Sequence, residues 1–426
     1  MKSFSRSIVA ALIAVLARAI VRKYKPLIVM VTGSVGKTST KDAVAAALSD
    51  RYYLRASEKS YNSEFGVPLT IIGAGNPWFN VGAWIKVIEE ALALIFLPSH
   101  YPKLLVLEVG ADRPGDIKHI LKIVTPDAVV VTKLPDIPVH VEAYASAEAV
   151  REEEFIPAYA LKAGMPLIIC ADDPHAKRLS ARLSAKIVTF GFAPDALVCL
   201  SEVQVMHKDG CPIGMSVTAT YNGESYTLNA PCALGRSQVC APAAAFAAAI
   251  ALNSTPKEAL KGLSGYEPPA GRGRVLTGIH SSVLIDDTYN ASPAATEEIL
   301  ESLTLVDAKR RIVVLGDMLE LGRYSVGEHE RIGRLASTVS DVVVGVGVRA
   351  RALVEAARKE GKGEVYEYPD SYAAVAGLTS LLKEGDLVLI KGSQSVRMER
   401  ITEGLLAHKE DTKKLVRQDK EWLNKK

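Results

Sequence analysis

Val29-Met-Val-Thr-Gly-Ser-Val-Gly-Lys-Thr-Ser-Thr40 is the stretch that decides the fold. The apolar run 27–31 predicts a buried strand, and a helical pattern begins at Lys37, so a glycine-bearing turn joins the two. Such a turn points backbone N–H groups at one spot, and the helix N-terminus adds partial positive charge there. Lys37 suits the outer phosphates of a nucleotide, and the Thr38 hydroxyl suits Mg²⁺. The stretch predicts an ATP site; the alternative is a glycine-rich turn without a ligand.

The composition describes a globular protein with more than one domain. The chain has 426 residues, of which 48% are hydrophobic and 23% charged. This length predicts two or three domains. A net charge of +3, with no basic run interleaved with aromatic residues, argues against a nucleic-acid partner. Five scattered cysteines without a Cys-x-x-Cys pair indicate neither zinc nor a disulfide framework, and they fit a reducing cytosol.

The N-terminal segment is apolar and basic. The run 8–16 is too short to span a bilayer, and Arg18, Arg22, Lys23 and Lys25 follow it. Two interpretations remain open: a helix packed on the domain, or a basic amphipathic helix on the inner membrane surface. A second apolar helical pattern over 81–97 has the same two interpretations. We therefore expect a short helix over residues 1–26, with peripheral membrane contact through residues 1–24 as one interpretation.

The order of apolar runs predicts an α/β protein. From 27 to about 192, short apolar runs alternate with helical patterns, which favours a parallel sheet with helices on both faces. From 197 to 228, short alternating stretches and two hairpin turns predict a small antiparallel subdomain. The Pro- and Gly-rich stretch 266–274 resembles a boundary, after which the alternation restarts. We expect a phosphate-loop ATPase domain over 27–270, a Rossmann-like domain over 271–426 and a solvated helix in the charged tail from 409.

Polar residues follow several predicted strands. Glu108 ends an apolar strand, where a parallel sheet has its ligand crevice, and its carboxylate suits Mg²⁺. His140 follows the end of another strand at the same edge. In the second domain, polar residues end three strands and describe a crevice facing the first domain. Those residues include Asp287, Asn290, Asp317 and Lys391. Ordinary structural roles are the alternative for each.

Taken in order, these motifs resemble the Mur ligase family, and most of all its MurF branch. The resemblance runs from about residue 25 to 407, and its carriers are 32–39, 61–68, 107–116, 140–142, 271–272, 286–293, 315–322 and 391–393. Each motif is weak alone, but their joint occurrence in order is specific. The general phosphate-loop pattern has a glycine where this chain has Val31, and the family's Thr-Gly-Ser-x-Gly-Lys-Thr loop accounts for that departure.

The resemblance implies an ATP- and Mg²⁺-dependent amide ligase. A substrate carboxylate attacks the γ-phosphate to give an acyl phosphate, and an amine then displaces phosphate. Lys37, Glu108, His140 and Glu154 are the implied catalytic residues. The implied nucleotide site comprises Gly33, Ser34, Gly36, Lys37, Thr38, Ser39, Arg272, Asp287 and Asn290. Asn62, Asp317 and Lys391 would bind the substrates, and Thr38, Glu108, His140 and Glu154 would organise Mg²⁺. Closure of the domains would exclude water that hydrolyses the acyl phosphate.

Three departures from the family pattern qualify this picture. Only about 26 residues precede the first strand, so we expect the usual UDP-gripping N-terminal domain to be lacking and the acceptor to carry another handle or be gripped by another chain. Glu154 stands where the family has a carbamylated lysine, which gives the hypothesis that its carboxylate replaces the carbamate; a solvated acidic helix face is the alternative. Ser237, Gln238 and Ala241 replace the usual His and Asn residues, so an adenine contact is either lost or made by Gln238.

The leading interpretation is a cytoplasmic, monomeric ligase of peptidoglycan synthesis that adds D-alanyl-D-alanine to a muramoyl-peptide precursor. Its partners would be a small-molecule peptide precursor and an amino acid or dipeptide. One alternative is an amide ligase for another polymer: pseudomurein, polyglutamate or capsule. A second is a non-catalytic ATP-binding subunit, and a third is a membrane scaffold that depends on the N-terminal helix.

Overall fold

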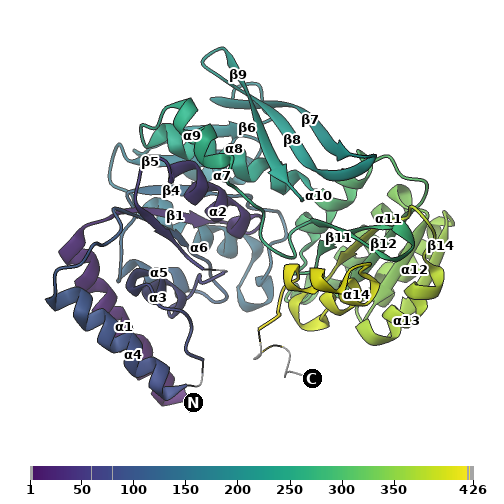
Figure 1. Cartoon of the computed structure of the whole chain (residues 1–426), viewed down its shortest axis with the longest axis horizontal. Coiled ribbons are helices and arrows are strands. Elements are labelled where there is room, and N and C mark those ends of the chain that lie inside the picture. Colours follow the sequence, from purple (N-terminus) through teal and green to yellow (C-terminus); the bar gives the residue numbers. More distant parts are fainter. Residues whose placement is uncertain (1–2, 59, 79, 420–421, 423–426) are drawn as a thin grey trace.

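The structure is a computed structural model that describes residues 3–58, 60–78, 80–419 and 422. Two β-sheets organise the chain, and Figure 1 shows them in two bodies that lie side by side. The first sheet has the strand order β2-β3-β1-β4-β5-β6-β7-β8-β9, and the second has the order β10-β11-β15-β12-β13-β14. The α/β fold class predicted from the sequence is confirmed.

The first body contains the N-terminal half of the chain. Its strands are β1 (Leu27–Thr32), β2 (Leu54–Ala56), β3 (Leu104–Glu108), β4 (Ala128–Val131), β5 (Pro166–Cys170), β6 (Lys186–Gly191), β7 (Val198–Lys208), β8 (Cys211–Tyr221) and β9 (Glu224–Pro231). Its helices are α1 (Ser3–Tyr24), α2 (Lys37–Leu48), α3 (Gly66–Ile72), α4 (Val81–Phe96), α5 (Asp116–Leu121), α6 (Ala147–Tyr159), α7 (Pro174–Ser180), α8 (Arg236–Ala251) and α9 (Pro256–Leu263).

The predicted antiparallel region extends the same sheet. Neighbouring strands pair in parallel from β2 to β7, and β7, β8 and β9 then pair antiparallel. Asp209-Gly210 and Asn222-Gly223 make the two hairpin turns, and all four residues have positive φ. The turn prediction is therefore confirmed, although the region is a continuation of the sheet because β6 and β7 are hydrogen-bonded to each other.

Successive side chains of the buried strands point to opposite faces of the sheet and pack in two different hydrophobic cores. Val29 and Val31 of β1 pack with α2 and the alanine-rich α8, whereas Ile28 and Met30 pack with the layer that contains α1, α3, α4 and α6. A strand buried on both faces reads as a continuous apolar run, which is why β1 was recognisable in the sequence. The small side chains of α8 allow it to be buried on nearly every side.

The second body is mostly parallel. Its strands are β10 (Arg274–Thr277), β11 (Val283–Asp287), β12 (Arg311–Gly316), β13 (Val342–Val346), β14 (Glu364–Tyr368) and β15 (Leu387–Lys391); only β10 pairs antiparallel. Its helices are α10 (Pro293–Leu303), α11 (Ser325–Val339), α12 (Ala350–Glu360), α13 (Ser371–Leu381) and α14 (Glu399–Leu405). The carboxyl ends of β11, β12 and β15 lie at the edge of this sheet that bears the polar motifs.

The tail differs from the solvated helix expected from its charge. After a short 3₁₀ segment (Lys409–Lys414), Leu415, Val416 and Arg417 are buried. The guanidinium of Arg417 donates to the carbonyl of Thr288 and lies 2.8 Å from the carboxylate of Glu399. The expected solvated helix is therefore met only in part. Residues Lys409–Lys414 form a helix with no buried residue, whereas the next segment is buried through a pairing that charge composition does not reveal. The end of the tail, residues 420–421 and 423–426, lies outside the described residues.

Candidate active site

The phosphate-binding loop has the strained geometry that its glycines permit. Gly33 has φ of 112°, and a Cβ there would lie 2.4 Å from the Thr132 hydroxyl, so only glycine fits. Gly36 precedes α2 with φ of 83°, and no side chain caps this helix. The first N–H groups of α2 are therefore available to an anion. The ammonium of Lys37 folds back onto the carbonyl of Gly33.

Glu108 is a buried carboxylate beside this loop. It ends β3 with 1% of its surface exposed, and one of its oxygens, Oε1, accepts a 3.3 Å hydrogen bond from Thr38. The other oxygen, Oε2, is buried without a hydrogen-bond partner. Burial raises the pKa of this carboxyl, and the nearby Lys37 and Lys41 only partly oppose that effect. An unpartnered buried carboxylate oxygen is a position where a cation would be stabilised.

Glu154 of α6 also contacts the phosphate-binding loop. It is 4% exposed, so the solvated acidic face considered from the sequence is wrong. Its Oε2 accepts a 2.5 Å hydrogen bond from the Ser34 hydroxyl, and its Oε1 lies 3.9 Å from the ammonium of Lys37. Burial raises the pKa of Glu154, whereas Lys37 and Ser34 lower it. A carboxylate is thus placed between the loop and its lysine.

His140 connects the two bodies. It follows β4 with φ of 65°, and its Nδ1 lies 2.9 Å from Oε2 of Glu320, which follows β12. Its Nε2 lies 3.6 Å from Asp112. Burial lowers the pKa of His140, but the hydrogen bond and the charge of Glu320 outweigh burial and raise it above the ordinary value. The same contact lowers the pKa of Glu320.

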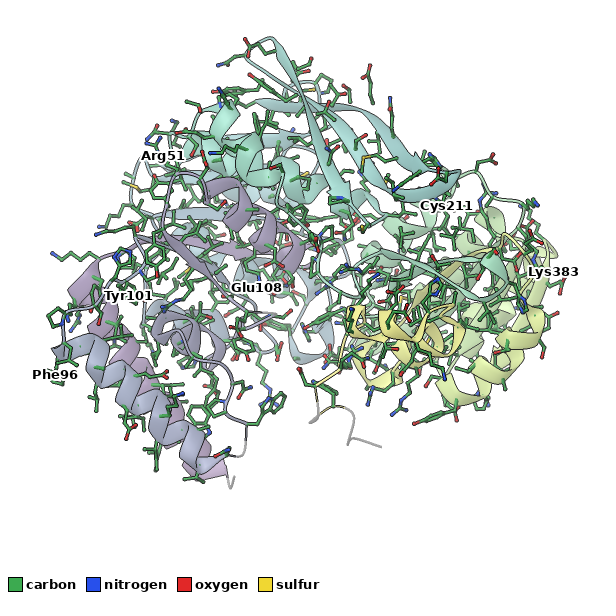
Figure 2. The ribbon with its side chains drawn as sticks, in the orientation of Figure 1. Arg51, Phe96, Tyr101, Glu108, Cys211 and Lys383 are labelled. Carbon is green, nitrogen blue, oxygen red and sulfur yellow. The ribbon has the colours of Figure 1, made fainter. Side chains whose placement is uncertain are left out.

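These groups surround one cavity of about 490 Å³, which we call the loop cavity. Both bodies line it, with Ser34, Gly36, Lys37, Thr38, Ser60, Asn62, Glu108, Asp112, Val139, His140, Glu154, Arg272, Tyr289, Asn290, Leu319, Glu320, Ser393, Gln394, Ser395 and Trp422. Figure 2 shows Glu108 near the line where the two bodies meet. Among the described residues, however, no three His, Cys, Asp or Glu side chains converge closely enough to hold a metal by themselves. The side chains predicted to bind Mg²⁺ therefore do not form a complete metal site by themselves.

A smaller inner cavity continues from the loop into the second body. Arg272 and Gln238 line it, together with Asp287, Asn290 and Lys391. The ammonium of Lys391 lies 2.6 Å from Asp287 and donates to the carbonyl of Asn290, and Lys391 is 3% exposed. Ser39, which is also predicted to bind nucleotide, lines the same cavity. Lys391 therefore orders the Asp287 and Asn290 segment in this conformation.

Among the predicted site residues, Gly33 and Asp317 line neither of these cavities, and Asp317 has a structural role elsewhere. Its carboxylate accepts a 2.8 Å hydrogen bond from the backbone N–H of Ala350 at the start of α12. A Cβ on Gly347 would lie 2.6 Å from the same carboxylate. Asp317 therefore stabilises the turn after β13 in this structure, and its position at the end of β12 did not distinguish that role from ligand binding.

Two domain models of one family match the chain. The Mur ligase middle domain matches residues 85–249, and the glutamate ligase domain of the Mur ligases matches residues 271–394. The UDP-N-acetylmuramoyl-tripeptide–D-alanyl-D-alanine ligase of Bacillus subtilis (strain 168) is 27% identical over 394 residues, which cover 92% of this chain and 78% of the relative. The Mycobacterium leprae enzyme of the same name is 29% identical, over 89% and 73% of the two chains.

The chain belongs to the Mur ligase family.

Solved structures agree with this assignment. The MurF ligase of Thermotoga maritima in complex with ADP superimposes with a TM-score of 0.75 and 25% identity, over 93% of this chain and 83% of that one. A folylpolyglutamate synthase of Mycobacterium tuberculosis, 14% identical with a TM-score of 0.64, shares the fold. As a Mur ligase, the chain is an ATP-dependent enzyme that forms amide bonds. The family and reaction class predicted from the sequence are confirmed.

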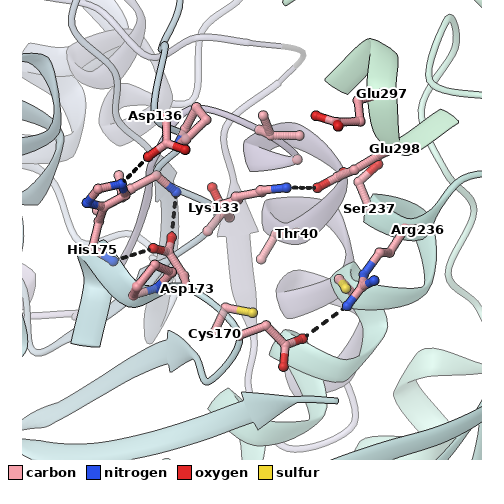
Figure 3. A pocket seen from close by; sticks show the side chains of 18 of the residues that line it. Thr40, Lys133, Asp136, Cys170, Asp173, His175, Arg236, Ser237, Glu297 and Glu298 are labelled. Carbon is pink, nitrogen blue, oxygen red and sulfur yellow. Dashed lines mark hydrogen bonds and ion pairs between the residues drawn. The ribbon is translucent and has the colours of Figure 1, made fainter. Parts of the chain in front are cut away.

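This Mur ligase has a further cavity of about 400 Å³ on the far side of the loop, which we call the bridge cavity (Figure 3). It shares Val35 and Gly36 with the inner cavity. Lys133, after β4, forms a 2.7 Å ion pair across it with Glu298 of α10. Arg236 and Asp172 pair at 3.3 Å on another wall. The bridge cavity is thus closed by a contact between the two bodies.

Several groups that line the loop cavity were not predicted from the sequence, among them Glu320, Tyr289 and Ser60. Glu320 lies within a quoted motif, yet only the folded structure shows that it faces His140. Tyr289 stacks under the guanidinium of Arg272, whose carbon lies 4.0 Å from the ring centre. Ser60 lies 3.1 Å from the Thr38 hydroxyl. Tyr289 and Glu320 both lie inside family motifs at strand ends, which could have indicated a role in the site. The sequence alone did not distinguish these positions from ordinary loop positions.

Proposed function

We propose that this Mur ligase joins D-alanyl-D-alanine to the terminal carboxylate of a UDP-linked muramoyl tripeptide, with hydrolysis of ATP to ADP and phosphate. The names of its relatives support the substrates. The observation that carries the proposal is the loop cavity, where the loop, Glu108 and His140 of one body face Glu320 and Gln394 of the other. Such a site can hold a triphosphate and two substrates only when both bodies contribute.

Phosphate binding is the role we assign to Gly33, Ser34, Gly36, Lys37, Thr38 and Ser39. The uncapped start of α2 presents N–H groups, and Lys37 has to leave the carbonyl of Gly33 to reach a γ-phosphate. Arg272 joins them, because its guanidinium lies 3.4 Å from the Thr38 hydroxyl and stacks on Tyr289. Cationic groups here neutralise the charge that builds up when a carboxylate approaches a triphosphate.

The residues present fit Mg²⁺. The Thr38 hydroxyl and the unpartnered Oε2 of Glu108 are oxygen donors, which Mg²⁺ prefers, and bound phosphates would supply further oxygens. We assign His140 and Glu154 to positions beyond these two, because the described residues do not converge as a complete set. Bound Mg²⁺ would supply positive charge at the transferring phosphoryl group.

Glu154 takes the place of a carbamylated lysine in our proposal. Its carboxylate is buried, faces Lys37 and is fixed by the Ser34 hydroxyl. A carbamate and a carboxylate both present two oxygens and one negative charge, so the same position is occupied without bicarbonate. Glu154 then holds Lys37 and the loop in register until the nucleotide arrives.

The nucleoside would extend from the loop through the inner cavity toward the bridge cavity. Asp287 and Asn290 are the proposed ribose contacts, and both line the inner cavity. Gln238 is 4% exposed and its side-chain carbonyl is buried without a hydrogen-bond partner, so it offers an acceptor to a nucleoside N–H or O–H group. This supports the interpretation in which Gln238 replaces a lost family contact.

The acceptor would lie in a cavity of about 550 Å³ that adjoins the loop cavity, which we call the tail cavity. It shares Thr38, Ser60 and Arg272 with the loop cavity, so a carboxylate bound there can face the γ-phosphate. Aromatic walls, Phe65 and Tyr289 among them, suit the apolar faces of sugar and peptide groups. We place Asn62 at the junction, because it lines the loop cavity.

The chain's own groups then support two steps. The acceptor carboxylate oxygen attacks the γ-phosphorus while the bond to the β-phosphate oxygen breaks, which gives an acyl phosphate and ADP. The amine nitrogen of the dipeptide attacks the acyl carbon, phosphate leaves with the C–O bonding pair, and the nitrogen loses a proton. His140, paired with Glu320, can hold the two bodies together at the loop cavity while water is excluded.

We further propose the division 1–26, 27–270 and 271–426, a monomeric cytoplasmic enzyme and membrane contact through residues 1–24. Phosphate release tests the reaction itself. With UDP-linked muramoyl tripeptide and D-alanyl-D-alanine together, phosphate and an amide product should form in equal amounts. Turnover indifferent to the amine would instead indicate an ATP-binding subunit, and no response to D-alanyl-D-alanine with any acceptor would refute the assigned dipeptide.

A further inference from the structure

Large exposed apolar side chains gather on two helices. Among the described residues, eight of the nineteen such side chains belong to α1 and to α4 with its C-cap. They are Ile8, Leu12, Val15, Val81, Ile85, Leu92, Phe96 and Leu97. Single exposed apolar residues are ordinary, but a concentration of this kind marks an interaction surface. The remaining ones are distributed over the rest of the molecule.

Helix α1 is apolar on opposite sides. Ile13, Ala17 and Ile20 are buried in the core that α1 shares with α3 and α4. Ile8, Leu12 and Val15 recur at the i, i+4, i+7 spacing of one helical stripe, on the side away from that core, and Val15 is 59% exposed. A helix with apolar residues on all sides is stable when each side is covered by apolar groups. In α1, the described part of the protein covers one side and leaves the other exposed.

Helix α4 carries a second such stripe. Val81, Ile85, Leu92 and Phe96 lie on one side of it and are exposed, whereas Trp84, Val87 and Ala91 are buried. Figure 1 shows α1 and α4 side by side, projecting from the first body, and Figure 2 shows Phe96 at the left-hand end of α4. We call the eight exposed side chains of these helices the apolar face.

The C-terminal ends of the two helices are tied together beside a basic group. The ammonium of Lys23 donates to the carbonyls of Leu94 and Leu97 at the end of α4. Arg22 and Lys25 are exposed next to it along the chain. Residues 1–25 contain six Lys and Arg residues and no acidic residue, whereas the rest of the chain has a net charge of −3. The N-terminal segment thus carries an excess of positive charge, and its described exposed cations, Arg22, Lys23 and Lys25, lie at one end of the apolar face.

This charge distribution indicates which partner binds the apolar face. In a symmetric dimer through the apolar face, two copies of the same cationic segment would meet, and like charges oppose each other. An anionic bilayer surface offers the complementary charge together with hydrocarbon for the stripes. None of the described helices is long and apolar enough to cross a membrane, so the contact is one in the plane of the interface.

We propose that the apolar face of α1 and α4, with Arg22 and Lys25, docks the enzyme on an anionic lipid bilayer. The proposal goes beyond membrane contact of residues 1–24, because it assigns five of the eight exposed side chains to α4 with its C-cap and selects the lipid charge. It also has a consequence for the acceptor. Phe65, which lines the tail cavity, packs edge-on against Trp84 of α4, and the Trp84 indole donates to the carbonyl of Trp78 in the cavity wall. The wall of the proposed acceptor site is therefore built on a docking helix.

Sedimentation of the full chain with vesicles tests the proposal. One set of vesicles contains phosphatidylcholine alone, and the other contains phosphatidylcholine with phosphatidylglycerol. The variants are Val15→Glu/Ile85→Glu/Phe96→Glu on the apolar face and Arg22→Glu/Lys25→Glu beside it. Val326→Glu/Val348→Glu is the matched control, because both residues are exposed apolar residues of the second body. Thermal melts and ATP turnover without vesicles establish that each variant is folded.

The wild type and the control should sediment with the anionic vesicles and much less with phosphatidylcholine. The apolar-face variant should lose binding by about tenfold or more, and the charge-reversal variant roughly 30-fold with loss of salt dependence. Failure of the wild type to bind either vesicle, or equal binding by the apolar-face variant, would overturn the proposal. A wild-type dimer that this variant dissociates would instead show that a second copy covers the face. Amide synthesis from soluble substrates is a separate readout, so loss of docking and loss of the proposed reaction are distinguishable.

Discussion

The hydroxyl of Ser34 donates a 2.5 Å hydrogen bond to the buried carboxylate of Glu154, whose other oxygen lies 3.9 Å from the ammonium of Lys37. A residue of α6 thereby fixes the geometry of a loop more than a hundred positions away in sequence. The loop's own glycines permit its shape, but Glu154 selects the position of the lysine.

Replacing Glu154 with Gln should lower phosphate release and raise the Mg²⁺ concentration needed for half-maximal rate, each by roughly 10–100-fold. The reason is that the variant keeps the shape and loses the charge that faces Lys37. Titration of Mg²⁺ at saturating ATP measures it. Glu152→Gln on the same helix is the control, because Glu152 accepts a hydrogen bond from Tyr159 and, like Glu154, lies on α6.

A second replacement tests whether Glu154 stands in for a carbamylated lysine. Glu154→Lys should be inactive in bicarbonate-free buffer and should recover part of its activity when bicarbonate is added, since carbamylation restores a carboxylate-like group. The wild type should be indifferent to bicarbonate. Unchanged Mg²⁺ dependence in Glu154→Gln, together with bicarbonate-independent activity in Glu154→Lys, would contradict the assigned role.

Glu108→Gln should lose activity while gaining stability. Burial raises the pKa of Glu108, and one oxygen of its side chain has no hydrogen-bond partner, so a neutral amide is less costly to bury. We expect phosphate release to fall by about 10³-fold, in the range found when a transition-state contact is lost. The unliganded protein should become more stable by about 1 kcal/mol. Activity and denaturant midpoints measured on one preparation check both; a destabilised, fully active variant would contradict the account.

The contact between His140 and Glu320 should couple the two bodies. Single replacements with Ala and the double replacement form a cycle on kcat/KM for the amine, and we expect a coupling of about 1 kcal/mol. Because Glu320 raises the pKa of His140 and His140 lowers that of Glu320, the contact is complete between these two pKa values. It weakens as pH rises through the elevated pKa of His140. The exposed pair Arg351 and Glu367 is the control and should show no coupling in this assay.

Asp286 predicts a pH dependence of stability. It is fully buried in β11, and burial raises its pKa to about 6 from 3.8 despite hydrogen bonds from Thr288 and Thr402. The folded state therefore holds a proton that the unfolded chain has released between about pH 4 and 6, and stability falls as pH rises through that window, by up to roughly 3 kcal/mol. Above pH 6 the loss is complete.

Asp286→Asn should consequently raise the melting temperature at pH 7.5, by about 2–4 °C for each kcal/mol gained, with only about a third of that gain at pH 4.5. The amide oxygen still accepts from both threonines. Asp307→Asn, an exposed position of the same body, should change neither value. An equal gain at both pH values would show that ionisation of Asp286 is not the cause.

Local sequence patterns predicted most of the fold. Continuous apolar runs marked the strands buried on both faces, and Asp209-Gly210 and Asn222-Gly223 marked both hairpins, because those signals depend on neighbouring residues alone. The edge strands β2, β10 and β14 were missed, since none of them forms a long apolar run.

Site residues that lie in family motifs could be predicted from the sequence. Contacts between residues far apart in the sequence were less predictable. Glu154 was identified by spacing, but its burial against Ser34 was not. The pairing of Lys391 with Asp287 and the helix-capping role of Asp317 depend on side chains brought together by the second sheet. The apolar periodicity of α1 was equally consistent with packing and with membrane contact, and the structure shows that one side of the helix is packed and the other exposed.

The most direct test of the central claim is simultaneous measurement of phosphate and amide product with ATP, UDP-linked muramoyl tripeptide and D-alanyl-D-alanine. The account predicts that both products form in equal amounts, that omission of either substrate abolishes the amide, and that Glu108→Gln abolishes both signals. Release of phosphate that proceeds equally without D-alanyl-D-alanine, with no amide formed, would contradict it.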